Sequence, residues 1–174
     1  MGIVHVYDIA GNAWFSQFTS TEAISHVDAM PGDYPLPTGR MEMCSVTASA
    51  EDNSSHNIYI YGGWDGSGSA VESDVWILSL PAFVWVSANP KTVIDPESNT
   101  RGISKHRCQK IHDRYMVAYR GKNVNDICDS DRRFPKLHGM TILDMSSLQW
   151  TTKVKIDNQK YLIPSELYFT IGGK

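Results

Sequence analysis

IYIYGGWDG, residues 58 to 66, is a run of alternating Ile and Tyr that ends in two glycines. Large β-branched and aromatic residues in alternation are typical of a β-strand, and because both alternating positions are apolar we expect burial on both faces. Gly62 and Gly63 tolerate positive φ and close packing, so they predict a sharp turn where the strand leaves a crowded region. A phosphate-binding loop would need a helix after the glycines, but Ser67-Gly68-Ser69 leads into another strand.

Similar short stretches follow one another along the chain. They are rich in β-branched and aromatic residues and are separated by clusters of Asn, Asp, Gly, Ser and Pro. In order they are VHVYD, CSVTASA, NIYIYGG, DVWILSL, FVWVSA, YMVAYRG, GMTILDM and LQWTTKV. No interior stretch has the spacing of a long amphipathic helix. Near the end, IPSELYFTIGG fits either a short helix between Pro164 and Gly172 or one more strand.

A hairpin that ends in Trp occurs three times. YDIAGNAW, LSLPAFVW and LDMSSLQW place Trp14, Trp85 and Trp150 at a constant distance from a Tyr or Leu across a turn. The second and third copies are preceded by another pair of matching hairpins, CSVTASAEDNSSHNIYIYGG and HRCQKIHDRYMVAYRG. The repeated unit is therefore four strands, two before the glycines and two after them.

This unit resembles the kelch repeat, which forms one blade of a β-propeller. The resemblance covers nearly the whole chain and rests on Gly62-Gly63, on the Trp hairpins, and on Arg40 or His106 shortly before the first strand of a unit. Within that class the sequence is similar to secreted or membrane-anchored fungal kelch proteins related to the central domain of galactose oxidase. In the last unit Arg120-Gly121 stands where the glycine pair is expected, which indicates either a tolerated substitution or an arginine that projects into the channel mouth.

The predicted fold is a single all-β domain over residues 1–174, a kelch-type propeller sector of about two and a half four-stranded blades. The predicted parts are a half blade over 1–38, full blades over 39–90 and 101–156, and a C-terminal tail over 157–174. Because propellers close with about four to eight blades, the ring is expected to be incomplete. An incomplete ring leaves blade faces and strand edges exposed. We therefore expect that the chain is a fragment of a longer propeller, such as a truncated product, or that self-association or a partner covers these surfaces.

Composition narrows the classes of partner. The 174 residues have a net charge of −3, with 41% hydrophobic and 20% charged residues. We therefore expect no nucleic-acid partner and no electrostatic attraction to anionic membranes. No apolar run approaches the roughly 18–20 residues of a membrane-spanning helix, so direct membrane insertion is not expected either. The resemblance implies a location outside the cell or at its surface, yet MGIVHVYDIAGNAWF lacks the pattern of a signal peptide.

Three cysteines and one sequon are candidates for covalent modification. The resemblance implies a disulfide between Cys108 and Cys128 in an oxidising compartment, with buried thiols as the alternative. Cys44, at the start of CSVTASA, is interpreted as a core thiol. Asn53-Ser54-Ser55 is an N-glycosylation sequon and, equally, a set of residues that favour a hairpin turn.

No catalytic residue, metal ligand or cofactor is predicted. The last unit is rich in His and Cys, but it has no CxxC pair, and ligands two apart on a strand do not form a chelating turn. Asp129 and Asp131 are followed by arginines instead of the Gly and Glu of a calcium loop. The cross-linked Tyr and Cys, second Tyr and paired His of a copper-radical oxidase cannot be placed on this sequence. The His and Cys residues considered are His106, Cys108, His112, Cys128 and His138.

The sequence instead predicts a binding function. The loops after the second strands, 64–73 and 122–137, occupy equivalent places in successive blades and should emerge on one propeller face. Trp and Arg are frequent at protein interfaces, and Trp also stacks on sugars. The hypothesis is a non-catalytic kelch module that binds a protein or a cell-surface glycan; the alternative is a remnant of a galactose-oxidase-like copper oxidase. The candidate binding residues are Trp64, Asp65, Arg120, Lys122, Asn123, Arg132 and Arg133.

Overall fold

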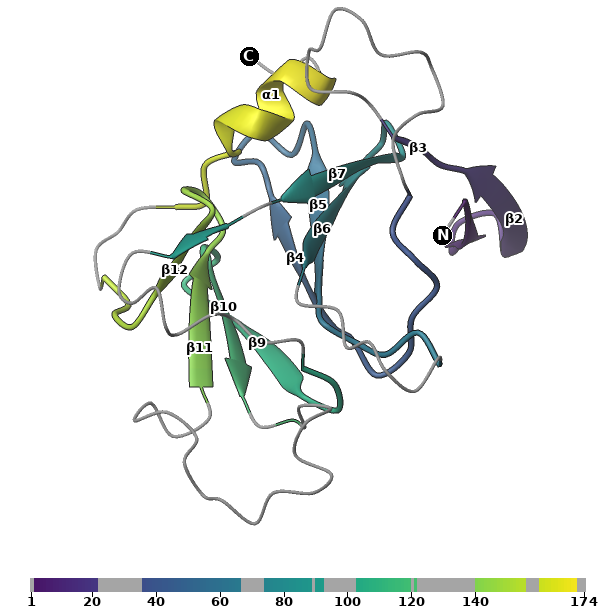
Figure 1. Cartoon of the computed structure of the whole chain (residues 1–174). Coiled ribbons are helices and arrows are strands. Elements are labelled where there is room, and N and C mark those ends of the chain that lie inside the picture. Colours follow the sequence, from purple (N-terminus) through teal and green to yellow (C-terminus); the bar gives the residue numbers. More distant parts are fainter. Residues whose placement is uncertain are drawn as a thin grey trace, which may run out of the picture.

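The described residues form two five-stranded sheets, one separate hairpin and one short helix (Figure 1). The computed structural model describes residues 2–21, 36–66, 74–88, 90–92, 103–119, 121, 140–155 and 160–171. The all-β class predicted from the alternating stretches is confirmed. The two sheets lie side by side, and a short helix lies across one end of them (Figure 1). The described residues form a sector and not a closed ring.

The first blade is built around the IYIY strand. Its four main strands run antiparallel in chain order, and a two-residue strand, which periodicity did not predict, pairs parallel to the last of them. Ser20 of this short strand also donates its amide to the Phe83 carbonyl at 3.1 Å. The strands are β3 (Ser20–Thr21), β4 (Cys44–Ser49), β5 (His56–Tyr61), β6 (Val75–Leu80) and β7 (Val84–Ala88).

The second blade repeats this arrangement. Its four main strands are again antiparallel in chain order, and again a two-residue strand from the preceding segment pairs parallel to the last one. Each five-stranded sheet therefore ends in a strand that follows the Trp hairpin of the preceding unit. The strands are β8 (Lys91–Thr92), β9 (Arg107–Ile111), β10 (Tyr115–Tyr119), β11 (Met140–Asp144) and β12 (Gln149–Thr151).

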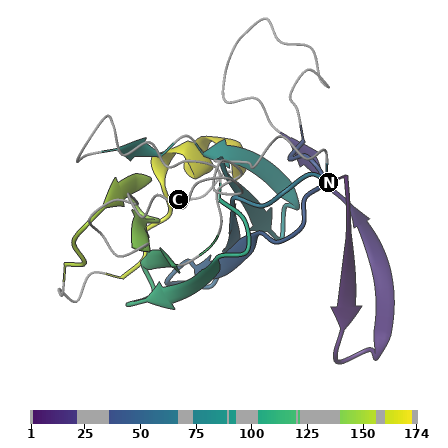
Figure 2. The ribbon, with the colours of Figure 1, turned by 60° about the horizontal axis from the view of Figure 1, so that its bottom comes forward.

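The N-terminal hairpin has the place of the outer half of a preceding blade. It consists of β1 (Ile3–Asp8) and β2 (Ala13–Phe18), and it projects away from the two blades (Figure 2). Among the described residues β1 pairs with β2 alone. Val4 packs against the apolar cluster on the outer face of the first blade, to which Trp76 and Trp85 belong. The hairpin thus contacts the first blade by one face only.

The main core lies between the two blades. Tyr59 of the first blade and Trp150 of the second belong to one buried cluster there. Ile60, the next residue after Tyr59, belongs to the cluster on the opposite face of the first blade. Burial of the IYIY strand on both faces is therefore observed, as its uninterrupted apolar sequence predicted. The innermost strand β4 differs, because only Cys44, Val46 and Ala48 are buried and the alternate residues are exposed.

The C-terminal segment forms a helix, which decides between the two predicted alternatives. Helix α1 (Ser165–Ile171) begins directly after Pro164, whose carbonyl accepts the amide of Leu167 at 2.9 Å. Leu167 is fully buried in the inter-blade cluster, so the helix is held by packing although it has only two turns. The described residues include no helix with the length and apolar character required to cross a bilayer.

Candidate functional site

Glycines form the turns at one end of the blades, where the predicted binding loops begin. Gly63 follows β5 with a φ of 108°, and Gly121 follows β10 with a φ of 118°. Because β5 and β10 are the second main strands of their blades, these glycines are equivalent. The two chains therefore turn out of their sheets in the same way and at the same end of the sector.

The glycines make room for the segment that leads into β9. A Cβ on Gly62 would overlap the Ile103 carbonyl oxygen and lie 2.8 Å from His106 Cε1. A Cβ on Gly121 would lie 2.6 Å from Ile103 Cγ1 and 2.8 Å from His106 Cβ. The amide of Gly63 donates to the Ile103 carbonyl at 2.8 Å. One segment of the second blade is thus inserted between the glycine turns of both blades.

Two of the predicted binding residues lie in the described part of this end. Trp64 exchanges two backbone hydrogen bonds of 2.8 Å with Met41, and its side chain is partly buried. Asp65 follows it and is exposed. The remaining candidates, which are Arg120, Lys122, Asn123, Arg132 and Arg133, lie outside the described residues.

A buried arginine supports the base of this loop. The side chain of Arg40 is 1% exposed, and its guanidinium donates to both carboxylate oxygens of Asp74 and, at 3.3 Å, to the carbonyl of Gly62. Asp74 also accepts the indole N–H of Trp76. These contacts connect the turn after β5 to the start of β6. The sequence pattern singled out Arg40, but its distance from Asp74 in the chain gave no indication of the pairing.

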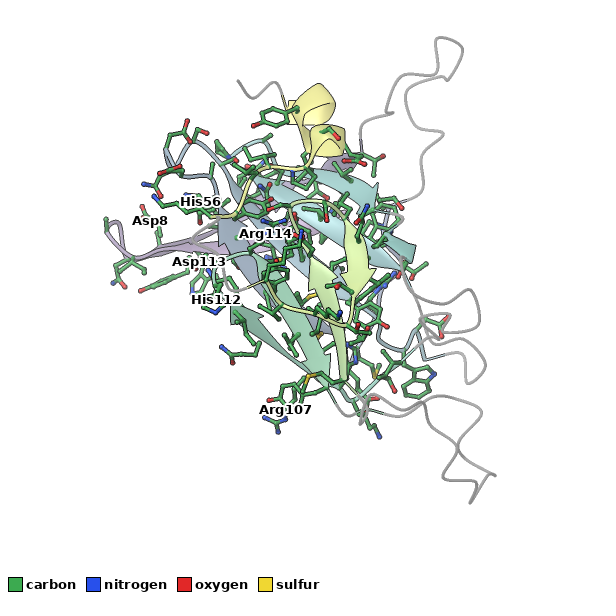
Figure 3. All side chains as sticks on the ribbon, turned by 90° about the vertical axis from the view of Figure 1, so that its left-hand side faces the viewer. Asp8, His56, Arg107, His112, Asp113 and Arg114 are labelled. Atoms are coloured by element: carbon green, nitrogen blue, oxygen red, sulfur yellow. A yellow bond between two sulfur atoms is a disulfide. The ribbon has the colours of Figure 1, made fainter. Side chains whose placement is uncertain are left out.

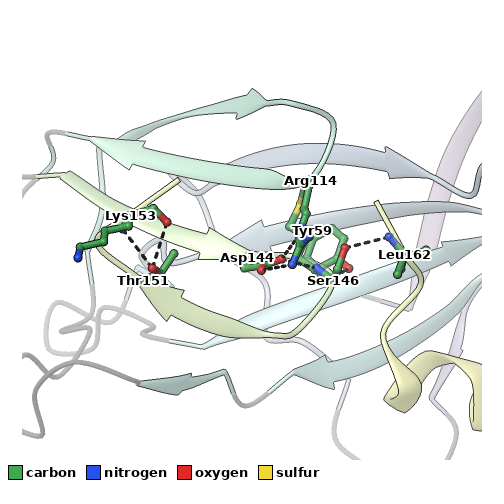
Figure 4. A network of polar contacts seen from close by, with 8 residues as sticks. Tyr59, Arg114, Asp144, Ser146, Thr151, Lys153 and Leu162 are labelled. Atoms are coloured by element: carbon green, nitrogen blue, oxygen red, sulfur yellow. Dashed lines mark hydrogen bonds and ion pairs between the residues drawn. The ribbon is translucent and has the colours of Figure 1, made fainter. Parts of the chain in front are cut away.

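A second arginine–carboxylate pair lies at the β9–β10 turn of the second blade (Figure 4). Arg114 donates from Nε to Asp144 Oδ1 at 2.8 Å and from Nη2 to Asp144 Oδ2 at 2.6 Å. Burial raises the pKa of Asp144, but the hydrogen bonds and charge of Arg114 lower it by more, so the net pKa is below the ordinary value. Ser146 donates its amide to Asp144, and its hydroxyl accepts the Leu162 amide at 2.9 Å.

The C-terminal segment also inserts a tyrosine between the blades. The Tyr161 hydroxyl lies 2.9 Å from the Tyr59 hydroxyl and accepts from Asn57 Nδ2 at 3.1 Å. Tyr59 donates to the Met145 carbonyl of the second blade at 3.1 Å. Burial raises the pKa of Tyr161 to about 12 and that of Tyr59 well above its usual value. Both phenols are therefore neutral, and their role here is to join the tail to both blades.

The His and Cys residues of the last unit do not form one group. Figure 3 shows His112, Asp113 and Arg114 together at one end of β9, while Arg107 lies at the other end. Asp113 pairs with Lys110 at 2.8 Å, and the hydrogen bond and charge of that lysine lower the pKa of the Asp113 carboxyl. His106 lies next to Arg107, so it is separated from His112 by the length of the strand. Cys128 and His138 lie outside the described residues.

The cysteine pairing differs from the one that the resemblance implied. Cys108 forms a disulfide with Cys44, and their Cα atoms are 5.5 Å apart. This bond joins the innermost strands of the two blades, β4 and β9. The Cys108–Cys128 pairing and the reading of Cys44 as a core thiol are corrected accordingly, because a cysteine at the start of β4 faces the second blade. The sequence did contain a signal, since both cysteines lie within the first two residues of an innermost strand, one repeat apart.

His106 lies beside this disulfide in an apolar setting. It is 5% exposed and stacks edge-to-face against Tyr61, with ring centroids 5.1 Å apart. Burial lowers the pKa of His106, and the nearby Tyr61 carbonyl raises it by less. Neither ring nitrogen has a hydrogen-bond partner of good geometry among the described residues. A ring nitrogen of His106 and the sulfurs of Cys44 and Cys108 all lie within 4.8 Å of one another.

The sequon residue lies away from all of these groups. Asn53 is exposed in the turn between β4 and β5, with a φ of 57°, and its amide donates to the Ala50 carbonyl at 3.0 Å. Asn tolerates this left-handed conformation better than most residues. The turn-forming property of Asn53 is therefore used in the fold, and glycosylation of its exposed side chain stays a prediction.

Comparison with known proteins supports the kelch assignment. No protein-family model matches the chain. The chain is 32% identical over 155 residues to a kelch repeat-containing protein of Arthroderma benhamiae. The match covers 86% of this chain but 19% of that protein, so the chain spans about a fifth of the length of its relative. Together with the two sheets of equivalent topology, this similarity confirms the predicted partial kelch propeller.

Proposed function

We propose that these kelch-type blades form a non-catalytic interaction module, which binds a protein partner at the end from which the loops after β5 and β10 leave. The observation that carries the proposal is the equivalence of Gly63 and Gly121, with φ values of 108° and 118°. The second main strands of two consecutive blades therefore end in the same turn conformation, at the point where each of these loops begins. Propeller blades repeat around a central channel, so equivalent loops of successive blades belong to the same end of the ring.

The described part of this surface has the properties of a binding anchor. The backbone of Trp64 is held by two hydrogen bonds to Met41, and the turn beneath it is held by the buried Arg40. A rigid backbone reduces the entropy that is lost when a partner binds. Trp64 is partly exposed and lies beside the exposed Asp65. In protein interfaces, tryptophans of this kind are frequent hot spots, and polar residues commonly surround them.

The experiment compares two variants in a proximity-labelling assay in cells. Trp64→Ala is expected to reduce labelling of the specific partners at least tenfold, since central interface tryptophans cost about 2 kcal/mol or more on truncation. Ile9→Ala is the control, because Ile9 is 85% exposed in the turn of the N-terminal hairpin. Identical partner sets for both variants would contradict the proposal. Retained binding to a glycan array that depends on Trp64 would identify a glycan ligand instead.

Absence of catalysis is part of the proposal and has its own test. The purified chain is incubated with copper, and bound copper and hydrogen peroxide release on a panel of sugars are measured. We expect no peroxide release above that of a heat-denatured sample. Sugar-dependent peroxide release together with bound copper would establish the oxidase alternative.

We also propose that the chain functions within a longer propeller. It spans 19% of its kelch relative, and β1 pairs with β2 alone among the described residues. Opposite residues of an antiparallel pair share a face, so Tyr7 and Trp14 lie on the same side of the hairpin as Ile3 and Phe18. Val4 on the other side faces the first blade. The face with Trp14 is thus the one on which a preceding blade would pack.

The isolated chain is expected to self-associate through this hairpin face. Its four apolar residues are 41–74% exposed, with Tyr7 at 41% and Phe18 at 74%. Replacing both Trp14 and Phe18 with Ser is expected to weaken self-association at least tenfold in light scattering after size exclusion, since large apolar surface is removed. Ile9→Ser is the control, because Ile9 is exposed in the hairpin turn. A monomeric wild-type chain whose β1 amides resist hydrogen exchange would contradict this expectation.

A further inference from the structure

We propose that Cys44, His106 and Cys108 form a zinc site between the two blades, which is filled when the Cys44–Cys108 disulfide is reduced. The inference is independent of the proposed binding function. It rests on three ligand-type side chains that meet although they come from two blades: Cys44 begins β4, Cys108 lies in β9, and His106 immediately precedes β9.

The three ligand atoms are spaced as a small metal ion requires. The two sulfurs and a His106 ring nitrogen all lie within 4.8 Å of one another. With Zn–S near 2.3 Å and Zn–N near 2.0 Å, ligand atoms in a tetrahedral site are about 3.5–3.8 Å apart. Once the sulfur–sulfur bond is opened, the two sulfurs separate toward this spacing. No large backbone movement is needed, because the Cα atoms of the two cysteines are 5.5 Å apart.

The backbone around the cluster is fixed by contacts that do not involve the disulfide. The Lys105 amide donates to the Glu42 carbonyl at 3.1 Å, and the Gly63 amide donates to the Ile103 carbonyl at 2.8 Å. Lys105 Nζ also lies 3.3 Å from a Glu42 carboxylate oxygen. These bonds link the segment before β4 and the turn after β5 to the segment before β9. The three ligands therefore stay close together when the cysteines are reduced.

The burial and hydrogen bonding of His106 are those expected of a metal ligand in a site that holds no metal. Its side chain is 5% exposed, and neither ring nitrogen has a hydrogen-bond partner of good geometry among the described residues. Buried polar atoms without partners are uncommon and costly, so an unpaired imidazole beside two sulfurs needs an explanation. Bond formation to zinc satisfies one of these nitrogens. The Tyr61 backbone carbonyl lies beside the ring, and a carbonyl at one ring nitrogen leaves the other nitrogen for a metal.

The charges favour zinc over other thiophilic ions. Two thiolates and a neutral imidazole around Zn²⁺ give a site with no net charge, which a buried position tolerates. Cu⁺ with the same ligands would leave one negative charge in an apolar environment. Hard ions such as Ca²⁺ and Mg²⁺ prefer oxygen ligands, which this cluster does not offer. Solvent or a further side chain would complete the tetrahedral coordination.

Filling of the site requires a reductant and releases protons. A thiol or phosphine reductant supplies two electrons and the disulfide takes up two protons, which gives two free thiols. Binding of Zn²⁺ then replaces the two thiol protons with two sulfur–zinc bonds. In an oxidising compartment the blades are joined by the disulfide, and in a reducing compartment they are joined by zinc. The same two cysteines thus connect the blades in both states, through a disulfide when oxidised and through bound zinc when reduced.

The test uses the full chain with Cys128→Ser, so that Cys44 and Cys108 are the remaining cysteines of the three. The protein is reduced with a phosphine, which is removed without oxygen, and is titrated with Co²⁺ as a spectroscopic probe and then with Zn²⁺. We expect one metal ion per chain, with thiolate-to-cobalt charge-transfer absorption that Zn²⁺ abolishes. The oxidised protein is expected to show no such absorption.

Variants of two histidines separate the cluster from other sites. His106→Asn is expected to weaken metal binding at least tenfold, whereas His112→Asn, at the exposed far end of β9, is expected to leave it unchanged. Zinc is also expected to slow alkylation of Cys44 and Cys108 at least tenfold in the chain that keeps His106, a readout that needs no destabilised variant. The proposal is overturned if the reduced chain takes up no stoichiometric metal, if zinc gives no protection, or if a well-folded His106→Asn chain binds as the His112 control does.

Discussion

Gly62→Ala is expected to lower the free energy of unfolding by about 3 kcal/mol. Two effects combine at this position. Its φ of +64° costs a residue with a Cβ about 1–2 kcal/mol. The new Cβ would also overlap the Ile103 carbonyl oxygen and press on the His106 ring, and relief of such overpacking costs about 1–3 kcal/mol more.

Two other glycines separate these contributions. Gly66 has a φ of +89° but nothing within 4 Å of its Cβ position, so Gly66→Ala is expected to cost about 1–2 kcal/mol from backbone strain alone. Gly39 has open space and no positive φ, so Gly39→Ala is expected to change stability by less than about 1 kcal/mol. Urea unfolding followed by tryptophan fluorescence measures all three. If Gly62→Ala and Gly66→Ala lowered the free energy of unfolding equally, Ile103 would not be tightly packed against Gly62.

Arg114→Met is expected to destabilise the chain by about 3 kcal/mol at neutral pH. It leaves Asp144, whose side chain is 12% exposed, without its bidentate partner, and an unpaired buried charge costs about 3–5 kcal/mol. The exposed pair of Lys160 and Glu51, with side chains 66% and 65% exposed, is the matched control. Lys160→Met is expected to cost less than about 1 kcal/mol, because solvent screens such pairs.

The pH dependence of this variant distinguishes lost charge pairing from lost packing. The pKa of Asp144 is lowered in the folded chain, so its stabilisation is complete above the unfolded value of 3.8 and is lost as the pH falls through the folded value. Without Arg114, burial raises that pKa instead, so protonation then favours the folded state. The difference in stability between the wild type and Arg114→Met should therefore shrink as the pH falls from 7 toward 4.

A double variant provides the remaining control. Arg114→Met with Asp144→Asn replaces the unpaired carboxylate by a neutral group of similar shape. It is expected to be at least about 1 kcal/mol more stable at neutral pH than Arg114→Met, since the penalty arises from the buried charge. A pH-independent loss, with no recovery in the double variant, would mean that packing of the Arg114 stem accounts for the effect.

The parts of this fold that the sequence predicted are those determined within one hairpin. The Ile58–Tyr61 alternation produces a strand, and Gly62-Gly63 ends it, because these preferences act over a few residues. The Trp hairpins marked the repeats for the same reason. Their burial, however, depends on neighbours: Trp85 is 4% exposed, whereas Trp14 in the same motif is 72% exposed on the projecting hairpin.

Features that depend on contact between blades were not predictable in this way. The two-residue strands β3 and β8 are too short to show periodicity, and only their position beside β7 and β12 makes them strands. The Cys44–Cys108 pair and the insertion of Ile103 between two glycine turns likewise depend on how the sheets pack. The expectation of no metal site was based on ligand spacing along one segment, and that criterion does not consider ligands supplied by two blades, as in the zinc site proposed here.

Through the parallel pairing of β3 and β8, each unit contributes an edge strand to the sheet of the unit that follows it. Strand β8 follows β7 of the first blade along the chain, yet it hydrogen-bonds to β12 of the second blade. Strand β3 stands in the same relation to the hairpin and the first blade. Local opening of one unit therefore pulls an edge strand from the unit that follows it, but not from the unit before it. Hydrogen exchange of the amides at these blade edges is therefore expected to follow opening of the preceding unit, whereas the shared core, the Cys44–Cys108 disulfide and Tyr161 connect the two blades in both directions.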